Sequence, residues 1–347
     1  MGFSLNGLIN TASYNDLVDY GVAGGGGPSG SGLKGLSVNY LYNVGYGPYG
    51  FGQPNPLAVV AAGDSITSVQ WTAAVTRVTA MANHQGTISQ LKPTDPTTVN
   101  DVIKYDIDYY NNLTPLNDNL FSAVAQGTPT SITGTCTSTW KQQCYFDHVI
   151  TFPSADQARY FFNAGGQLKM TYSSPVGATY KIDYLMNQLA LDVGTVVISG
   201  MGTNVPLPKG VKIAGTTYTG ITQIAPRWPC SYIERDKGYY GCTSSAVTNF
   251  NNLNTLALTQ TARAGLSTYL DTNLKVRVMT NGTQGSNNDN GNILTIRSIF
   301  DEVPDGGAGD STVSAGTTAT CTIVPPSTTY LTNTWGTPTT TVAFVAT

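Results

Sequence analysis

Hydrophobic residues in the N-terminal part of the chain recur at the spacing of an α-helix. A short helix is expected from Ser13 to just before Gly21, and a firmer one begins after Thr67, which forms a capping box with Gln70 and ends at Gly86. One apolar stripe runs along the firmer helix: Trp71, Val75, Val78 and Ala82. The same spacing predicts another helix over residues 98–111.

From about residue 128 the pattern changes to the alternation of β-strands. Ser154 and Gln157 cap a short helix between two alternating segments, so residues 145–173 read as strand, helix and strand. Residues 270–300 read as a hairpin. A helix near 182–189 and a Thr-rich strand around Cys321 complete the set. The first of the alternating strands places these residues on one face: Phe146, His148, Ile150 and Phe152.

These elements predict an α+β fold in two regions. Residues 1–127 form a helical region that contains a Gly-rich arm at 24–32, and residues 128–347 form a predominantly β, sandwich-like region with short inserted helices. The arm is either a contact between subunits or a flexible linker.

The composition is unusually poor in charge. Charged residues make up 11% of the chain, against about 25% in typical domains. Few charges must be desolvated when such a surface is covered, so it suits packing against protein neighbours. The net charge of −3 disfavours nucleic acid as a partner. No apolar run reaches membrane-spanning length, and residues 1–6 lack a secretory leader pattern, so we expect neither a membrane anchor nor a cleaved leader. An ordinary secreted β-protein is the plain alternative.

Four of the five cysteines form two close pairs, which are candidates for local disulfides. The pairs are Cys136 with Cys144 and Cys230 with Cys242. Free thiols are the alternative, and a zinc site is disfavoured because C-x2-C spacing is absent. Cys321 is left over, and is either buried or a contact between subunits.

An aromatic segment over residues 40–52 offers a second set of candidate contacts. Its members either dock on a neighbouring subunit or, as the default, pack on their own domain: Tyr42, Tyr46, Tyr49 and Phe51.

One segment imitates an enzyme. Residues 59–66 resemble the nucleophile block of GDSL hydrolases around Ser65, but that chemistry needs a histidine base in a later D-x-x-H block, and no histidine follows His148. A polar turn is the simpler interpretation. His84 is expected to cap a helix C-terminus, and His148 to be a satisfied core residue. We therefore predict no catalytic residue, no cofactor and no metal.

Residues 147–168 read DHVITFPSADQARYFFNAGGQL, with the pattern A-R-x-F-F-N-A-G-G at their centre. This segment resembles one in structural proteins of contractile-tailed, T4-like bacteriophages and cyanophages. Further similar pieces follow the same order over roughly residues 40–300: YGFGQ at 49–53, AGDSI at 62–66, TNGTQGSN at 280–287 and DNGN at 289–292.

The resemblance implies a virion protein without enzymatic activity, associated with the tail or neck as a collar, baseplate or fibre-anchoring subunit. Such a protein is assembled in the host cytoplasm, and its partners are copies of itself and other virion proteins, as a homo-oligomer. Disulfides would then form after release from the host. A receptor- or carbohydrate-binding module of a tail fibre is the alternative.

Overall fold

A computed structural model gives the arrangement of these elements. It describes residues 11–19, 37–43, 50–87, 113–120, 122–175, 182–183, 186–187, 190, 195–199, 211–213, 216–218, 273–281, 291–302 and 312–347.

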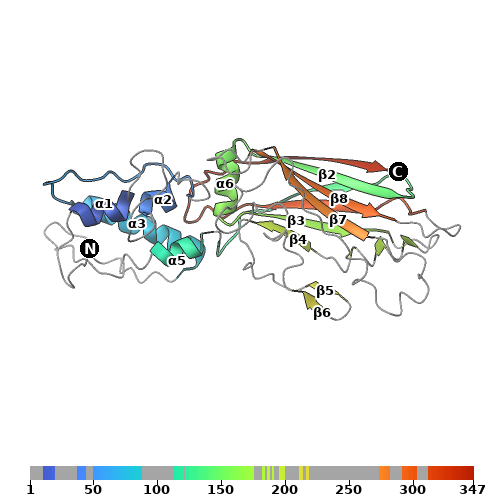
Figure 1. Cartoon of the computed structure of the whole chain (residues 1–347), viewed down its shortest axis with the longest axis horizontal. Coiled ribbons are helices and arrows are strands. Elements are labelled where there is room, and N and C mark those ends of the chain that lie inside the picture. Colours follow the sequence, from blue (N-terminus) through green and yellow to red (C-terminus); the bar gives the residue numbers. More distant parts are fainter. Residues whose placement is uncertain are drawn as a thin grey trace.

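The fold is α+β, as predicted, with helices at one end and a β-sandwich at the other (Figure 1). A short helix, α6, lies between the two regions. The helices are α1 (Thr11–Asp19), α2 (Val38–Tyr42), α3 (Ser68–Gln85), α5 (Leu113–Asp118) and α6 (Ala155–Asn163). The C-terminus lies at the end of the sandwich that faces away from the helices.

The longest helix confirms the pattern from which it was predicted. The Thr67 hydroxyl accepts a hydrogen bond from the Gln70 N–H, and the Gln70 Oε1 accepts one from the Thr67 N–H, so the capping box is complete. Gly86 ends the helix in the left-handed conformation, with φ of 70°. The predicted stripe is buried. The expected helix at 98–111 and the arm at 24–32 lie outside the described residues.

Two four-stranded antiparallel sheets form the sandwich. The first has the order β1-β9-β3-β4 and the second the order β10-β2-β8-β7; β5 and β6 form a separate ribbon. The strands are β1 (Thr130–Thr135), β2 (Gln143–Thr151), β3 (Gln167–Ser173), β4 (Thr195–Ser199), β5 (Val211–Ile213), β6 (Thr216–Tyr218), β7 (Asn273–Thr280), β8 (Ile293–Asp301), β9 (Thr318–Val324) and β10 (Thr339–Ala346).

The predicted strand–helix–strand unit is present, and its two strands lie in opposite sheets. β2 belongs to the second sheet and β3 to the first, so α6 carries the chain across one end of the sandwich. The predicted hairpin of residues 270–300 is the β7–β8 pair. The described residues of the expected helix near 182–189 are helical as well.

Side chains from both sheets meet in the core. The Tyr172 hydroxyl of β3 lies 3.2 Å from the Ser298 hydroxyl of β8, and its ring packs edge-on against Phe300. Gly134 of β1 leaves room for the opposite sheet, because a Cβ there would come within 2.7 Å of Phe146 and of Val342. The alternation of the strands thus places one face of each sheet in a shared core.

The carbonyl groups at the C-terminal end of α6 join the helical region to the sandwich. A helix end leaves its last carbonyls without partners inside the helix. His84, at the end of α3, donates from Nε2 to the Ala164 carbonyl at 2.9 Å, and Gln126 donates to the Gly165 carbonyl at 3.2 Å. We call this contact region, together with residues 50–53, the joint.

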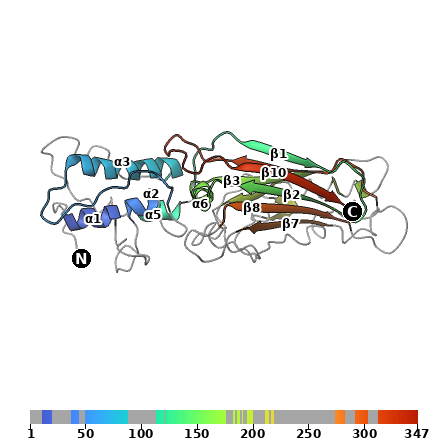
Figure 2. The same ribbon diagram turned by 90° about the horizontal axis from the view of Figure 1, so that it is seen from above.

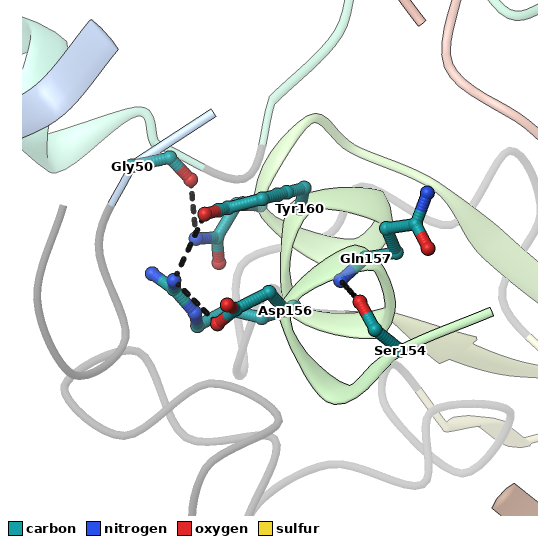
Figure 3. Close-up of polar contacts among 7 residues, drawn as sticks. Gly50, Ser154, Asp156, Gln157 and Tyr160 are labelled. Atoms are coloured by element: carbon teal, nitrogen blue, oxygen red, sulfur yellow. Dashed lines mark hydrogen bonds and ion pairs between the residues drawn. The ribbon is translucent and has the colours of Figure 1, made fainter. Parts of the chain in front are cut away.

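Asn163 adds a further buried bond to the joint. Its Nδ2 donates to the Gly50 carbonyl at 2.8 Å (Figure 3). On the same helix Arg159 forms an ion pair with Asp156 at 3.0 Å and lies over the Tyr160 ring. The A-R-x-F-F-N-A-G-G segment is therefore accounted for by packing and hydrogen bonding within the chain.

The C-terminal segment closes the joint from the other side. Gln53 binds Thr332 in both directions: its Nε2 donates to the Thr332 carbonyl at 3.0 Å, and its Oε1 accepts from the Thr332 backbone at 2.9 Å. Thr334 donates to the Phe51 carbonyl at 2.6 Å. Buried side-chain amides satisfied on both ends fix the partners in one arrangement.

Gly52 provides a test of how tightly the joint is packed. Its φ is +69°, and an added Cβ would overlap the Tyr160 ring. Gly52→Ala should therefore lose about 1–2 kcal/mol of folding free energy from the backbone and about 1–3 kcal/mol more from overpacking. Gly63 is the matched control, because it also has positive φ but no atom lies within 4 Å of its added Cβ. Urea denaturation of both variants measures the difference, and equal losses would contradict a tight joint.

Candidate assembly surface

β10, the C-terminal strand, forms an open edge of the second sheet. It pairs with β2 over eight consecutive residues and terminates the sheet on its other side. Its even-numbered side chains oppose the fully buried Phe146, His148 and Ile150, so they face the core. Phe344 nevertheless keeps 37% of its surface exposed, and outward-facing Val345 keeps 40%. Apolar side chains thus reach solvent along this edge.

The free edge of β10 presents backbone donors and acceptors from alternate residues. The Thr347 N–H donates to the Gln143 carbonyl at 2.9 Å, so odd-numbered residues direct their backbone groups toward β2. The even-numbered residues direct theirs outward: Thr340, Val342, Phe344 and Ala346. No described residue makes a backbone hydrogen bond to this side of β10.

β1 forms a second open edge beside the first. It terminates the other sheet and contacts β10 along the same side of the sandwich (Figure 2). The Cys136 N–H donates to the Thr317 carbonyl of the loop before β9, so even-numbered residues face β9. Ser131, Thr133 and Thr135 therefore direct their backbone groups outward, and their side chains are exposed. We call the two strands together the open edge.

The strands along this side of the sandwich carry no charged side chain. β1, β9 and β10 contain no charged residue. The outer face of the first sheet instead carries paired hydroxyls, such as Ser131 with Thr322 and Thr133 with Thr320, each at 2.8 Å. By contrast, the middle of the second sheet carries the two-pronged ion pair of Arg297 with Asp147, both contacts at 2.6 Å.

The aromatic candidates of residues 40–52 do not form part of this surface. Phe51 is fully buried and packs edge-on against His84 in the joint, so the alternative of a contact between subunits is wrong for this residue. Tyr42 is half-buried, packs against the core and lies under the Arg77 guanidinium. The default expectation of packing on the own domain is thus confirmed for these two. Tyr46 and Tyr49 lie outside the described residues.

The cysteines that are described are all buried and free. Cys321 lies in β9 at the centre of the core, which matches the buried alternative and leaves it no surface for a partner. Cys136 follows β1 and Cys144 lies in β2, so the two thiols neighbour each other across the two sheets, and the Cys136 thiol donates to the Ser138 carbonyl at 3.2 Å. Burial, with the neighbouring Cys136 thiol, raises the pKa of Cys144. Cys230 and Cys242 lie outside the described residues.

The two histidines are buried side chains. His84 donates to a carbonyl, so its proton sits on Nε2, and burial lowers its pKa; it binds α6 and does not cap its own helix with positive charge. His148 is a core residue, as expected, but neither ring nitrogen has a hydrogen bond of normal geometry to a described residue. Burial lowers the pKa of His148 to about 4, and the nearby backbone of Ala319 and Ile132 offsets this only in part.

Ser65 is exposed and directly follows a turn closed between Ala61 and Asp64, in agreement with the polar-turn interpretation. The Asp64 N–H donates to the Ala61 carbonyl, and Gly63 has φ of +97°. His84 is at the far end of α3, whose 18 residues span about 27 Å, and His148 is inside the sandwich. Neither imidazole reaches Ser65.

Glu302 is a buried carboxyl group that was not anticipated. It is 2% exposed, and neither carboxyl oxygen has a hydrogen-bond partner among the described residues. Burial, assisted by the negative Asp301, raises the pKa of Glu302 to about 7. Its inward direction continues the alternation of β8, in which Leu294, Ile296, Ser298 and Phe300 are buried. Extending that alternation by one step would have found it.

Within the described ranges, no three His, Cys, Asp or Glu residues gather as metal ligands, and no helix combines the length and apolarity needed to cross a membrane. No protein-family model, curated protein or solved structure matches this chain.

The shifted pKa values of Glu302 and His148 predict opposite effects of pH on the stability of the fold. Glu302 has a raised pKa, so its contribution to stability is complete below pH 4.5 and is lost as the pH rises through about 7. His148 has a lowered pKa, so its contribution is complete above pH 6.5 and is lost as the pH falls through about 4. The glutamine of Glu302→Gln is uncharged at every pH. The free energy of unfolding of this variant should therefore exceed that of the wild type by up to about 3 kcal/mol at alkaline pH and by little in acid.

Urea denaturation at a pH above 7 and at a pH below 4.5 tests this expectation. Asp64→Asn, on the exposed turn, is the control and should leave stability unchanged at both. A Glu302→Gln variant that is no more stable than the wild type at alkaline pH would show that the carboxyl group is not desolvated.

The Cys136–Cys144 pair predicts a disulfide between the sheets. Oxidised glutathione would take two electrons from the pair and become two thiols, while the two cysteines release their protons and form one S–S bond. The product should be about 2–4 kcal/mol more stable than the reduced chain. Alkylation in denaturant followed by peptide mass spectrometry identifies the pair, and Cys321 should remain a free thiol. Oxidation that joins Cys321 to either partner would contradict the arrangement.

Proposed function

We propose that this chain is a structural subunit of a tailed bacteriophage virion, associated with the tail or neck, and acts through protein–protein assembly. The observation that carries the proposal is the open edge, two neighbouring strands without charge whose backbone groups face solvent. Such edges template pairing with another chain unless they are protected. The choice of a phage particle as the assembly rests on the sequence segments that resemble proteins of contractile-tailed phages and follow the same order along the chain.

The low charge of the chain supports the same role. Charged residues are 11% of the total, and the strands of the open edge carry none. Covering such a surface removes few ionised groups from water, so the desolvation cost of a contact is small. Contacts with copies of the chain and with other virion proteins both fit this chemistry. The joint supports the role as well, because it holds the helical region to the sandwich through buried hydrogen bonds.

A carbohydrate-binding role at a fibre tip is less supported. Sugar recognition uses exposed aromatic faces, whereas Phe51 is fully buried and Tyr42 is half-buried under Arg77. A glycan array with the isolated protein separates the two roles, since saturable sugar binding would favour the fibre-tip module.

The proposal predicts that the chain is a stoichiometric component of the particle. Virions are purified by density gradient from infected cells that express this gene. Quantitative mass spectrometry should find peptides of the chain in these virions, in a fixed ratio to the capsid protein. Immunogold labelling of the same particles should place it on the tail or neck. Recovery of the chain only from the soluble part of the lysate would contradict the proposal.

A further inference from the structure

We propose that two copies of this chain pair through the open edge, with β10 antiparallel to β10 of the second copy about a two-fold axis normal to the sheets. This inference rests on the proposed assembly role and names the partner of the same surface. The four-stranded second sheet of each copy would then join into one continuous sheet.

The backbone of β10 is complementary to itself in this arrangement. Its outward donors and acceptors come from Thr340, Val342, Phe344 and Ala346, and two antiparallel copies oppose donor to acceptor throughout. The strand has no break in its register with β2, so its free side is regular over its length. A two-fold axis uses the same patch on both copies, which is the commonest way that identical subunits associate.

The direction of the side chains limits the register. Even-numbered residues of β10 face the core and odd-numbered residues face outward. In a continuous sheet, directly opposed residues point to the same side. Even-numbered residues of one copy must therefore oppose even-numbered residues of the other, so the axis passes close to Val342 or Ala343 when the overlap is longest. In such a register the half-exposed Phe344 packs against the core-facing side chains of the second β10, and water is removed from its ring.

The second open strand argues for a copy of this chain over an unrelated peptide. β1 lies beside β10 on the same side of the sandwich, and its outward backbone groups come from Ser131, Thr133 and Thr135 (Figure 2). The same two-fold axis brings the two β1 strands to face each other, so both sheets gain a neighbour. A single peptide strand would cover one edge and leave the other open.

The edge also lacks the features that keep natural edge strands apart. Monomeric proteins protect such edges with charged side chains, proline, bulges or a covering element. β1 and β10 contain no charged residue and no proline, and β10 has no bulge in its register with β2. Among the described residues no strand pairs with either free side.

Sedimentation equilibrium of the full chain tests the pairing, with two variants that act differently. Ala343→Lys places like charges near the axis while the backbone of residue 343 keeps its bonds to β2. Thr340→Pro removes an outward N–H and no bond to β2. We expect a dimer for the wild type and a dissociation constant raised on the order of tenfold or more in each variant. Thr171→Lys, on the exposed outer face of β3 and away from the open edge, is the matched control and should dimerise like the wild type.

Thermal unfolding of the variants, extrapolated to the monomer, should match the wild type and shows that the fold is kept. A wild type that stays monomeric at its highest soluble concentration, or a dimer unaffected by both edge variants, would overturn the pairing. Presence of the chain in purified virions with such a result would leave the proposed function standing. If the dimer forms as expected but the chain is absent from purified particles, the proposed function is wrong and the pairing still holds.

Discussion

The arrangement of the whole molecule depends on how the C-terminal end of α6 is satisfied. The carbonyl groups that follow the nine-residue helix have no hydrogen-bond donors within it. Their donors come from the helical region: His84 donates to the Ala164 carbonyl, and Gln126 donates to the Gly165 carbonyl. The His84 bond is buried, so leaving it unmade would cost about 1–3 kcal/mol, whereas the Gln126 bond is part-buried. Burial of His84 at this position lowers its pKa, which favours the uncharged imidazole. The joint therefore places the helices at one end of the sandwich.

With the helices held at that end, the long sides of the sandwich stay uncovered by the described helices. α6 carries the chain from β2 to β3 across the end of the sandwich, and the open edge runs along one side. The core beneath is closed by Gly134, which lets β1 approach Phe146 and Val342. The joint at one end and the open edge along one side therefore occupy separate parts of the sandwich.

Two buried ionisable groups inside the sandwich, His148 and Glu302, have opposite effects on how stability changes with pH. At mildly acidic pH, unfolding would let His148 take up a proton and Glu302 release one, so the net proton change is small even though each group is desolvated. Such compensation gives a sandwich whose stability changes little with pH between the two pKa values. The buried thiols of Cys136 and Cys144 are free, and their oxidation to a disulfide would add a covalent link at the end of the sandwich away from the helices.

Local patterns in the sequence were sufficient for α1, α3, α6, β2, β3 and the β7–β8 hairpin, because capping residues and alternation report on a segment's own backbone and on which face is buried. They could not show that β2 and β3 lie in different sheets or that Phe51 is enclosed by the joint. Nor could they show that Cys136 and Cys144 face each other across the sheets, or that β10 is an edge. Those facts depend on pairing between residues far apart in the chain, such as β10 with β2. Only the tertiary structure decides which strands have a neighbour on each side, and therefore where backbone groups remain free for a partner.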